Sequence, residues 1–253
     1  MAHFQAPQWL LTNDDGAEAP GLAALARACS GLARCVVAAP AIAWSCRGHS
    51  ITTDAAFRLQ PLGPDRFAIH ASPADCVRIG LHTLAPGVDW VIAGINEGAN
   101  LGADIHSSGT VAAAREAALH GRSAVAISHY LVRGRPVDWE RAARWAARVL
   151  DLITRLPAEP VVLWNVNLPC PPADAPPEDP EIVVCPVDPS PLPLGYEVEG
   201  DLARYRGSYH ERKRRPGGDV DVCFGGRISV SRLTLVPPWH EPGSLVRPGP
   251  GGP

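Results

Sequence analysis

The chain has 253 residues, of which 46% are hydrophobic and 19% charged, and its formal net charge is -3. This balance is typical of a globular protein and excludes a disordered, collagenous or coiled-coil chain. A nearly neutral chain also lacks the broad basic surface that nucleic acid requires, so we expect no nucleic-acid partner.

From Trp9 to about Ser128, the chain alternates short apolar runs with amphipathic helical patterns. WLL (9–11) predicts a strand, and CVVAA (35–39) predicts a second one. Between them, PGLAALARACSG predicts a helix that Pro20 opens and Gly31 closes. A strand, a helix and a strand within about 30 residues form a βαβ unit, which is right-handed and builds a parallel sheet.

The same alternation continues along the chain. Ser72, Pro73 and Asp75 predict the capped start of a helix. The later predicted elements are a strand at 90–94, a helix from Ser107 to Gly121, a strand at 124–128, a helix at 137–156 with Val149, Leu152, Ile153 and Leu156 facing inward, and the last sheet strand at 161–169. Together they predict an open, doubly wound α/β core with a mostly parallel sheet.

The sequence changes character after Pro169. PCPPADAPPEDP can continue neither a helix nor a central strand, so it predicts a linker. The later pieces EIVVC, DVDVCF and RISVSRLTL predict a hairpin arm and returning strands, and we interpret HERKRR (210–215) as a solvated loop or hairpin tip. We therefore expect one domain, divided into a core at 9–169, a linker and β arm at 170–236, and a disordered tail at 237–253.

The seven cysteines are scattered singly, without a C-x-x-C pair or a matching histidine cluster. This pattern indicates neither a zinc site nor a disulfide framework. No stretch approaches the roughly 18 to 20 apolar residues of a membrane span, and MAHFQAPQW lacks the features of a signal peptide. We expect a cytoplasmic protein with free, mostly buried thiols and no membrane contact.

Polar residues follow several of the predicted strands. In an open parallel sheet, ligands bind outside the carboxyl ends of the strands, so these residues are expected to converge on one edge. Four groups occupy such places: Asn13, Asp14 and Asp15 after the first strand, the Ser45 region after the second, Asn96 and Asn100 after WVIAG, and Ser107 to Thr110 at a helix start.

The adjacent carboxylates of Asp14 and Asp15 in LLTNDDGAEAPG have two interpretations. Asp-Gly is a common turn dipeptide. Alternatively, two carboxylates at a strand end raise each other's pKa, and a divalent cation relieves their repulsion. An acid pair joined by hydroxyl and amide oxygens, without histidine or cysteine, prefers Mg²⁺ or Mn²⁺ to zinc. The residues alone leave both interpretations open.

The segment GINEGANLGAD is a glycine-spaced loop that matches neither a dinucleotide fingerprint nor a P-loop. Its glycines would still let an anion approach the backbone. The following SSGTVAAA offers hydroxyl and backbone N–H groups at a helix start, where the dipole favours phosphate, although an ordinary cap has the same pattern. A metal site beside a phosphate cradle suits phosphoryl hydrolysis.

In order and spacing, these motifs resemble the SurE family of survival-protein nucleotidases. The resemblance rests on TNDDG with APG, SCRGHSIT (45–52), SPADCV, GINEGANLGAD and SGTVAAA, and more weakly on LWNVNLP and GGDVDVCFGGRISVSRL. It implies a Rossmann-like core and a C-terminal arm exchanged in a homodimer or homotetramer. It also implies a divalent-metal-dependent phosphatase for nucleoside 5′- and 3′-monophosphates, and sometimes for short polyphosphate.

Carried over by motif, the resemblance assigns roles to individual residues. One Mg²⁺ or Mn²⁺ would be bound by Asp14, Asp15, Ser45 and Asn96, and either aspartate would take the proton of the attacking water. The phosphate would be held by Ser108, Gly109 and Thr110, with Asn100 nearby. Sugar phosphates or polyphosphate as substrates, and a nucleotide-binding module without turnover, are the alternatives.

The sequence departs from the family pattern at several places. Ala41, Ile42 and Ala43 stand where the family commonly has charged residues, which puts the substrate range in doubt. The other departures are Cys46 in place of a glycine, Glu97 and Ala117 in place of small residues or glycine, and HEPGSLVRPG at the C-terminal end.

Five further polar residues have candidate roles in the site or in the fold. His49 and His106 are candidates for an acid, a base or a phosphate contact, with a structural role as the alternative. Asp104 is a candidate for orienting the loop of the site. Glu116 is interpreted as part of the packing or of a solvated face, and Asp219 as part of a strand.

Overall fold

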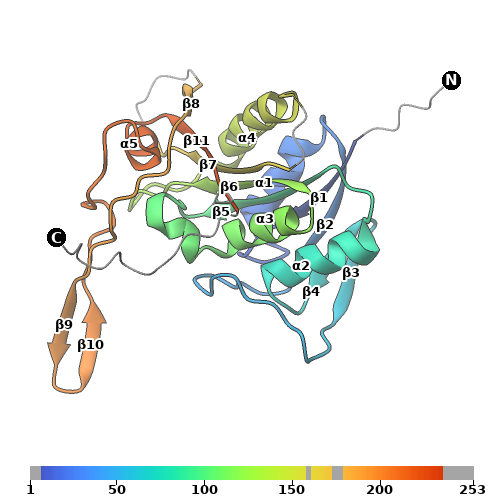
Figure 1. Ribbon diagram of the computed structural model, residues 1–253, viewed down its shortest axis with the longest axis horizontal. Helices are drawn as coiled ribbons and strands as arrows, with labels where there is room; N and C mark the ends of the chain where they lie inside the picture. Colours follow the sequence, from blue (N-terminus) through green and yellow to red (C-terminus); the bar gives the residue numbers. More distant parts are fainter. Residues whose placement is uncertain (1–6, 158–160, 173–178, 236–253) are drawn as a thin grey trace, which may run out of the picture.

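The computed structural model describes residues 7–157, 161–172 and 179–235 (Figure 1). In these residues one sheet contains nine strands, namely β1 (Gln8–Thr12), β2 (Arg34–Pro40), β3 (Leu59–Gly63), β4 (Arg66–Ile69), β5 (Trp90–Glu97), β6 (Ser123–His129), β7 (Leu163–Leu168), β8 (Ile182–Val184) and β11 (Ile228–Arg232). Their order is β3-β4-β2-β1-β5-β6-β7-β11-β8. Because β2, β1, β5, β6 and β7 pair in parallel, the predicted doubly wound α/β core is confirmed.

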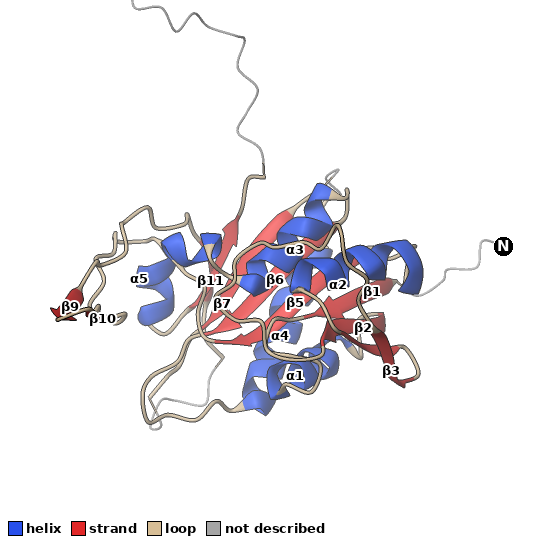
Figure 2. Cartoon of the chain, turned by 90° about the horizontal axis from the view of Figure 1, so that it is seen from below, coloured by secondary structure: helices blue, strands red, loops and turns tan. Residues whose placement is uncertain are grey.

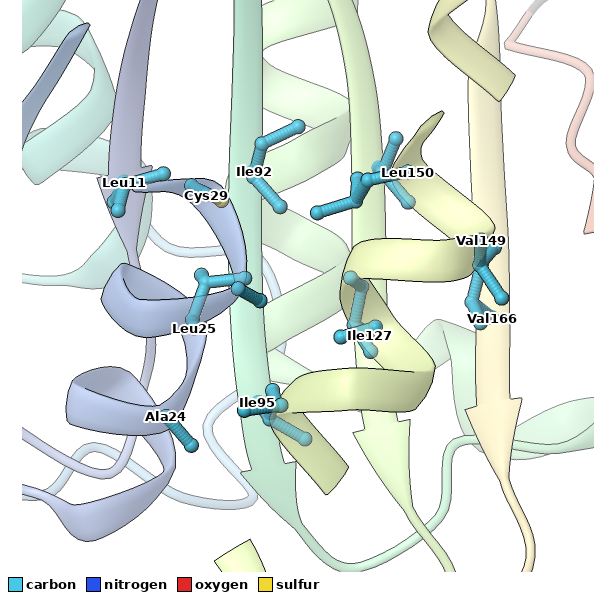
Figure 3. Packing of buried hydrophobic residues seen from close by; sticks show 14 of the residues in the cluster. Leu11, Ala24, Leu25, Cys29, Ile92, Ile95, Ile127, Val149, Leu150 and Val166 are labelled. Carbon is cyan, nitrogen blue, oxygen red and sulfur yellow. The ribbon is translucent and has the colours of Figure 1, made fainter. Parts of the chain in front are cut away.

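Helices cover both faces of this sheet. They are α1 (Pro20–Cys29), α2 (Pro73–Ile79), α3 (Gly109–Leu119), α4 (Trp139–Thr154) and the short α5 (Asp219–Phe224). Figure 2 shows α1 and α4 on one face and α2 and α3 on the other. Apolar side chains of α1 and α4, such as Leu25 and Val149, pack against Ile92 and Ile127 of the central strands (Figure 3).

Local sequence signals explain where these helices begin. Pro20 occupies the first turn of α1, where its missing N–H costs nothing. At the start of α2, the hydroxyl of Ser72 accepts from the backbone N–H of Asp75, and the Asp75 carboxylate accepts from the Ser72 N–H in return. Ser108 caps α3 in the same way, since its hydroxyl accepts from the backbone N–H of Val111 at 3.0 Å.

The predicted inward face of α4 was partly wrong. Val149 and Ile153 are buried as expected, whereas Leu152 and Leu156 are each 52% exposed. The buried residues of this helix recur as Trp145, Val149 and Ile153 with small residues and Leu150 between them. A helix that presents this stripe to the sheet turns Leu152 toward solvent, because successive residues are about 100° apart around the axis. Leu156 is exposed because α4 ends at Thr154, before that residue.

The C-terminal part differs from the prediction in two ways. The strand at 161–169 is not the last of the sheet, because β11 pairs antiparallel with β7 and β8 pairs parallel with β11. DVDVCF forms helix α5 and not a strand, so the strand interpretation of Asp219 was wrong. Six residues are too short for a period of 2 to exclude a helix, and acidic residues in the first turn favour one.

Two hairpins complete the described chain. β3 and β4, which were not predicted, form an antiparallel edge of the main sheet. β9 (Tyr196–Glu199) and β10 (Leu202–Tyr205) form a separate two-stranded sheet. This second hairpin projects away from the body (Figure 1), so a C-terminal hairpin arm is present as predicted, but residues 196–205 form it and not the segments EIVVC, DVDVCF and RISVSRLTL. The predicted disordered tail at 237–253 lies outside the described residues.

The seven cysteines are free thiols, four of them buried, as predicted. In the described part of the chain, no helix is both long enough and apolar enough to cross a membrane.

Candidate functional site

Asp14 lies just beyond the carboxyl end of β1, where three segments meet. Its side chain is only 4% exposed, and its Oδ1 accepts a hydrogen bond from the Thr110 hydroxyl at the start of α3. Its backbone oxygen accepts from the N–H of Trp44, in the loop after β2, at 2.7 Å. Asp14 therefore joins the end of β1 to the loop that carries Ser45 and to the predicted phosphate cradle.

Asp15 joins the same region to the end of β5. Its Oδ2 accepts from the backbone N–H of Glu97 at 3.0 Å, one residue beyond Asn96. The loop after β2 is also tied to the start of α3, because the Gly48 N–H donates to the Ser107 oxygen at 3.1 Å. These contacts place the four predicted polar groups at one edge of the sheet.

A turn after β1 aims the two carboxylates. The side-chain nitrogen of Asn13 donates to the Gly16 oxygen at 2.9 Å, and the Gly16 N–H donates back to the Asn13 side-chain oxygen at 3.3 Å. Gly16 has φ of 112°, a conformation that favours glycine. The Asp-Gly turn and the cation site are thus compatible interpretations of one segment.

Burial makes this carboxylate pair costly to ionise. Desolvation raises the pKa of Asp14 to about 6; the hydrogen bond from Thr110 opposes this shift, and the neighbouring charge of Asp15 adds to it. Burial also raises the pKa of Asp15, and the hydrogen bond from the Glu97 N–H opposes it. A bound cation would favour the charged form of both groups.

Gly109 fits against Asp14 because it has no side chain. A Cβ atom at this position would lie 2.7 Å from Asp14 Oδ2 and 2.8 Å from its Cβ, closer than real side chains approach. The first turn of α3 consequently packs directly on the carboxylate. Its unpaired N–H groups and the helix dipole are then available to an anion beside Asp14.

Ser45 and Asn96 are the more accessible members of the predicted metal set. Ser45 is exposed and Asn96 is half-buried. The side-chain nitrogen of Asn96 donates to the Gly98 oxygen at 2.5 Å, which leaves its side-chain oxygen as the atom suited to a cation.

Asn100 is fixed by a buried polar network beneath the loop. Its side-chain nitrogen donates to the Ser128 hydroxyl at 2.6 Å, and its backbone N–H donates to the Asn167 side-chain oxygen at 2.8 Å. Its backbone oxygen accepts from the side chains of Asn165 and Asn167. The predicted phosphate contact of Asn100 remains a prediction, and the network anchors the loop to β6 and β7.

Two residues of the C-terminal segment hold this loop, and sequence reasoning missed both. Arg212 donates to Asp104 Oδ2 at 2.6 Å and to the Leu101 oxygen at 3.1 Å, and its side chain is only 2% exposed. The interpretation of HERKRR as a solvated loop was therefore wrong for Arg212. Asp219 accepts from the backbone N–H of Gly102 at 2.9 Å. The predicted orienting role of Asp104 agrees with these contacts.

Glu116 is buried and holds the loop after β2 through His49. Its Oε2 lies 2.8 Å from His49 Nε2, and its Oε1 lies 2.9 Å from His120 Nε2. A solvated face is thus excluded for Glu116, and the structural role of His49 gains support. His106 is exposed.

The donor set fits a hard divalent cation. Carboxylate, hydroxyl and amide oxygens are the groups that Mg²⁺ and Mn²⁺ prefer. Within the described ranges, no group of three or more histidine, cysteine, aspartate or glutamate side chains could hold a metal ion. The metal set of Asp14, Asp15, Ser45 and Asn96 stays a prediction.

Comparisons with known proteins agree with this geometry. The family model described as survival protein SurE matches residues 9–187. A relative in Nostoc sp. is 48% identical over 227 residues, which cover 89% of this chain and 99% of that protein. The 5′-nucleotidase SurE of Paramagnetospirillum magneticum is 34% identical over 243 residues, which cover 88% of both chains.

A solved structure shows the same fold. The crystal structure of the SurE protein from Aquifex aeolicus superimposes with a TM-score of 0.80 at 29% identity, over 91% of this chain and 94% of that one. The sequence motifs, the arrangement of the sheet edge and these similarities lead to one conclusion: the chain belongs to the SurE family of survival proteins.

Proposed function

We propose that the chain is a divalent-metal-dependent phosphomonoesterase that hydrolyses nucleoside 5′-monophosphates, and also 3′-monophosphates, to nucleoside and phosphate. The nucleotidase names of its relatives support this activity. One structural observation carries the proposal: the buried carboxylate of Asp14 contacts Thr110 and packs on Gly109, so a cation site and an anion-binding helix start adjoin. Phosphoryl hydrolysis needs both.

One Mg²⁺ or Mn²⁺ would be held by Asp14, Asp15, Ser45 and Asn96. When bound, such an ion polarises the phosphoryl group and lowers the pKa of a coordinated water. The burial and adjacent charges of Asp14 and Asp15 support this assignment, because these charges need a counterion.

The start of α3 would bind the phosphate of the substrate. Ser108, Gly109 and Thr110 offer backbone N–H groups there, and the helix dipole favours the negative charge. The Thr110 hydroxyl donates to Asp14, and its backbone N–H also stabilises that carboxylate, so a phosphate contact of Thr110 would share these donors with Asp14. Either Asp14 or Asp15 would accept the proton of the attacking water, since both are carboxylates at this edge.

Replacing Asp14 by asparagine tests the proposal. Asp14→Asn preserves an oxygen for Thr110 but removes the charge, so metal-dependent release of phosphate from a nucleoside 5′-monophosphate should fall at least about 1000-fold. Asp54→Asn, in an exposed turn, is the matched control and should retain activity. Activity would be measured with Mn²⁺ and with chelator. Full activity of Asp14→Asn would exclude Asp14 as an essential ligand.

The apolar loop before Ser45 favours a second candidate substrate class. Ile42 is 68% exposed where the family commonly has charged residues, so polar contacts to a nucleoside are fewer on this side. Phosphatase activity toward sugar phosphates or short polyphosphate is the alternative. A panel of phosphate esters with Mn²⁺ separates these classes, and binding of nucleotides without phosphate release would instead indicate a module that lacks turnover.

We also propose that the hairpin β9–β10 joins subunits in a homodimer or homotetramer. An isolated two-stranded hairpin is marginally stable in water, and this one exposes Tyr196, Val198 and Leu202. A partner that covers these side chains would stabilise it. Light scattering on the protein and on a Val198→Asp, Leu202→Asp variant tests this, since a monomeric wild type contradicts it.

A cytoplasmic location is also proposed, and the free thiols support it, because a reducing compartment keeps cysteines unpaired.

A further inference from the structure

A cavity of about 500 Å³ lies between α2 and the C-terminal end of α3. Its walls come from α2, the helical turn η1 (Gly80–Leu84), the end of α3 and the segment at 52–57, and α2 and α3 lie side by side on one face of the sheet (Figure 2). It is lined by Thr52, Phe57, Asp75, Arg78, Ile79, Leu81, His82, His120 and Arg122. None of the residues assigned to the metal and phosphate site belongs to this lining.

The polar part of the lining is predominantly basic. Two arginines and two histidines, Arg78, His82, His120 and Arg122, face one acidic residue, Asp75. The Asp75 carboxylate is already engaged by the protein, because it accepts hydrogen bonds from the backbone N–H and hydroxyl groups of both Thr52 and Ser72. Little of its acceptor capacity is left for the arginines.

The arginines of the cavity are incompletely neutralised. Arg122 donates to the backbone oxygen of Pro86 at 3.2 Å and forms no ion pair with any described carboxylate. Arg78 approaches Glu116 only to 3.7 Å, and that carboxylate also serves His49 at 2.8 Å and His120 at 2.9 Å. One glutamate therefore balances three potential cations. A concave surface with this charge excess attracts a small anion.

The rest of the lining is apolar. Phe57, Ile79 and Leu81 form this part, and all three are only half-buried, so their surfaces are accessible to a ligand. Small-molecule sites commonly have volumes of about 300 to 1,000 Å³ and combine an apolar wall with a few polar groups. Guanidinium groups match phosphate oxygens in geometry as well as in charge.

We propose that this cavity is a second anion site, which binds a phosphate-bearing small molecule through Arg78 and Arg122, with His82 and His120 as further donors. The phosphate source is either the mononucleotide, whose base would contact Phe57, or inorganic phosphate released at the first site. The proposal does not require turnover, because no residue of the first site lines the cavity.

Equilibrium dialysis of the metal-loaded protein with radiolabelled phosphate tests this second site. We expect two phosphates per wild-type chain and one per Arg122→Gln chain, with affinity at the affected site reduced at least about 10-fold. Arg144→Gln removes the same charge from exposed α4, on the opposite face, and should still bind two. His82→Gln provides an independent variant and should weaken the same site.

The result for the second site is separable from the result for the first. If the first site binds no phosphate, the wild type binds one and Arg122→Gln binds none, and this outcome concerns the first site alone. Equal binding by wild type and Arg122→Gln, with both folded by circular dichroism, overturns the second site. A phosphonate analogue of the mononucleotide and the free nucleoside distinguish the ligand sources. Displacement of both labelled phosphates by the analogue identifies the nucleotide as a ligand of the second site, and displacement of the first-site phosphate alone identifies inorganic phosphate as its ligand. Displacement by the nucleoside alone would contradict a phosphate ligand.

Discussion

Asp14 and Asp219 are both buried carboxylates, but their surroundings supply different hydrogen-bond donors. Asp219 is fully buried and accepts backbone N–H groups from Gly102, Asp188 and Val220 at 2.8 to 2.9 Å. Asp14 is 4% exposed and has one neutral side-chain donor, Thr110, while a second carboxylate lies next to it in the chain. Burial raises the pKa of both.

The hydrogen-bond donors around each buried carboxylate distinguish Asp219 from Asp14. Three converging N–H groups meet the needs of Asp219, so it fastens the loop and requires nothing further. The charge of Asp14 is less well compensated: the Thr110 hydroxyl and the backbone N–H groups of Asp14 and Thr110 oppose the effect of burial, and the neighbouring Asp15 carboxylate adds to it. Burial alone does not mark a candidate site, because it raises the pKa of both carboxylates. A buried carboxylate with few hydrogen-bond donors and a second carboxylate beside it is the better candidate.

The largest effect is expected at Asp219. Asp219→Ala leaves the N–H groups of Gly102 and Asp188 buried without acceptors, and each such group costs about 1 to 3 kcal/mol. The free energy of unfolding should therefore fall by about 3 to 5 kcal/mol in a urea titration. Asp201→Ala, at an exposed hairpin turn, should change it little. An equally small fall in the free energy of unfolding of Asp219→Ala would show that these hydrogen bonds do not stabilise the fold.

The opposite sign is expected at Asp14 when no metal is bound. Asp14→Asn removes a charge that burial destabilises, yet it leaves an oxygen for Thr110. With chelator at pH 7.5, the variant should be more stable than wild type by about 1 to 3 kcal/mol. Added Mn²⁺ should stabilise wild type alone, since binding to the folded state raises stability. A destabilised variant in chelator would show that the charge is already compensated.

The stability difference between Asp14→Asn and wild type should depend on pH. Burial raises the pKa of Asp14 from 3.8 to about 6, so its stabilising contribution is fully present below 3.8 and is lost as pH rises through 6. In chelator, the stability gap between Asp14→Asn and wild type should be near zero at pH 4 and open by about pH 6.5. Urea titrations at intervals of pH measure it. A gap that is constant over this range would rule out titration of Asp14 as its cause.

The smallest effect is expected at Cys46, beside Ser45. Cys46 has φ of 58°, in the left-handed region that favours glycine, and it is exposed. Cys46→Gly should relieve this strain and stabilise the fold by about 0.5 to 1 kcal/mol. Asp65→Gly, at a φ of 53° in the β3–β4 turn, is a matched comparison away from the site. A loss of stability in Cys46→Gly would show that the side chain makes a compensating contact.

Local patterns predicted the part of the molecule that contains Asp14. The strands before Asp14 and Asn96 are apolar runs, and the helix at Ser108 begins with an ordinary cap. The topology of a parallel sheet then places their ends together, so the Asp14 edge follows from short-range signals and one general rule. The family resemblance added the residue roles, which the pattern alone left open.

The Asp219 region could not be predicted in the same way. Its key contacts join residues more than a hundred positions apart, such as Asp104 to Arg212 and Gly102 to Asp219. Nothing in the neighbourhood of Arg212 distinguishes it from the exposed Lys213, because partners so far apart in sequence leave no local periodicity. A six-residue helix such as α5 also carries too little pattern to identify it.

Because Gly109 packs directly on Asp14, each of these two positions restricts the residues that the other can hold. An alanine at 109 would displace the carboxylate, and a longer acid at 14 would meet the helix backbone, so neither position can drift while the other stays. A mutational library that samples 109 alone will therefore return mostly inactive clones. A redesigned chain should therefore keep Asp14 and Gly109 together, since the first turn of α3 fixes the position of the Asp14 carboxylate.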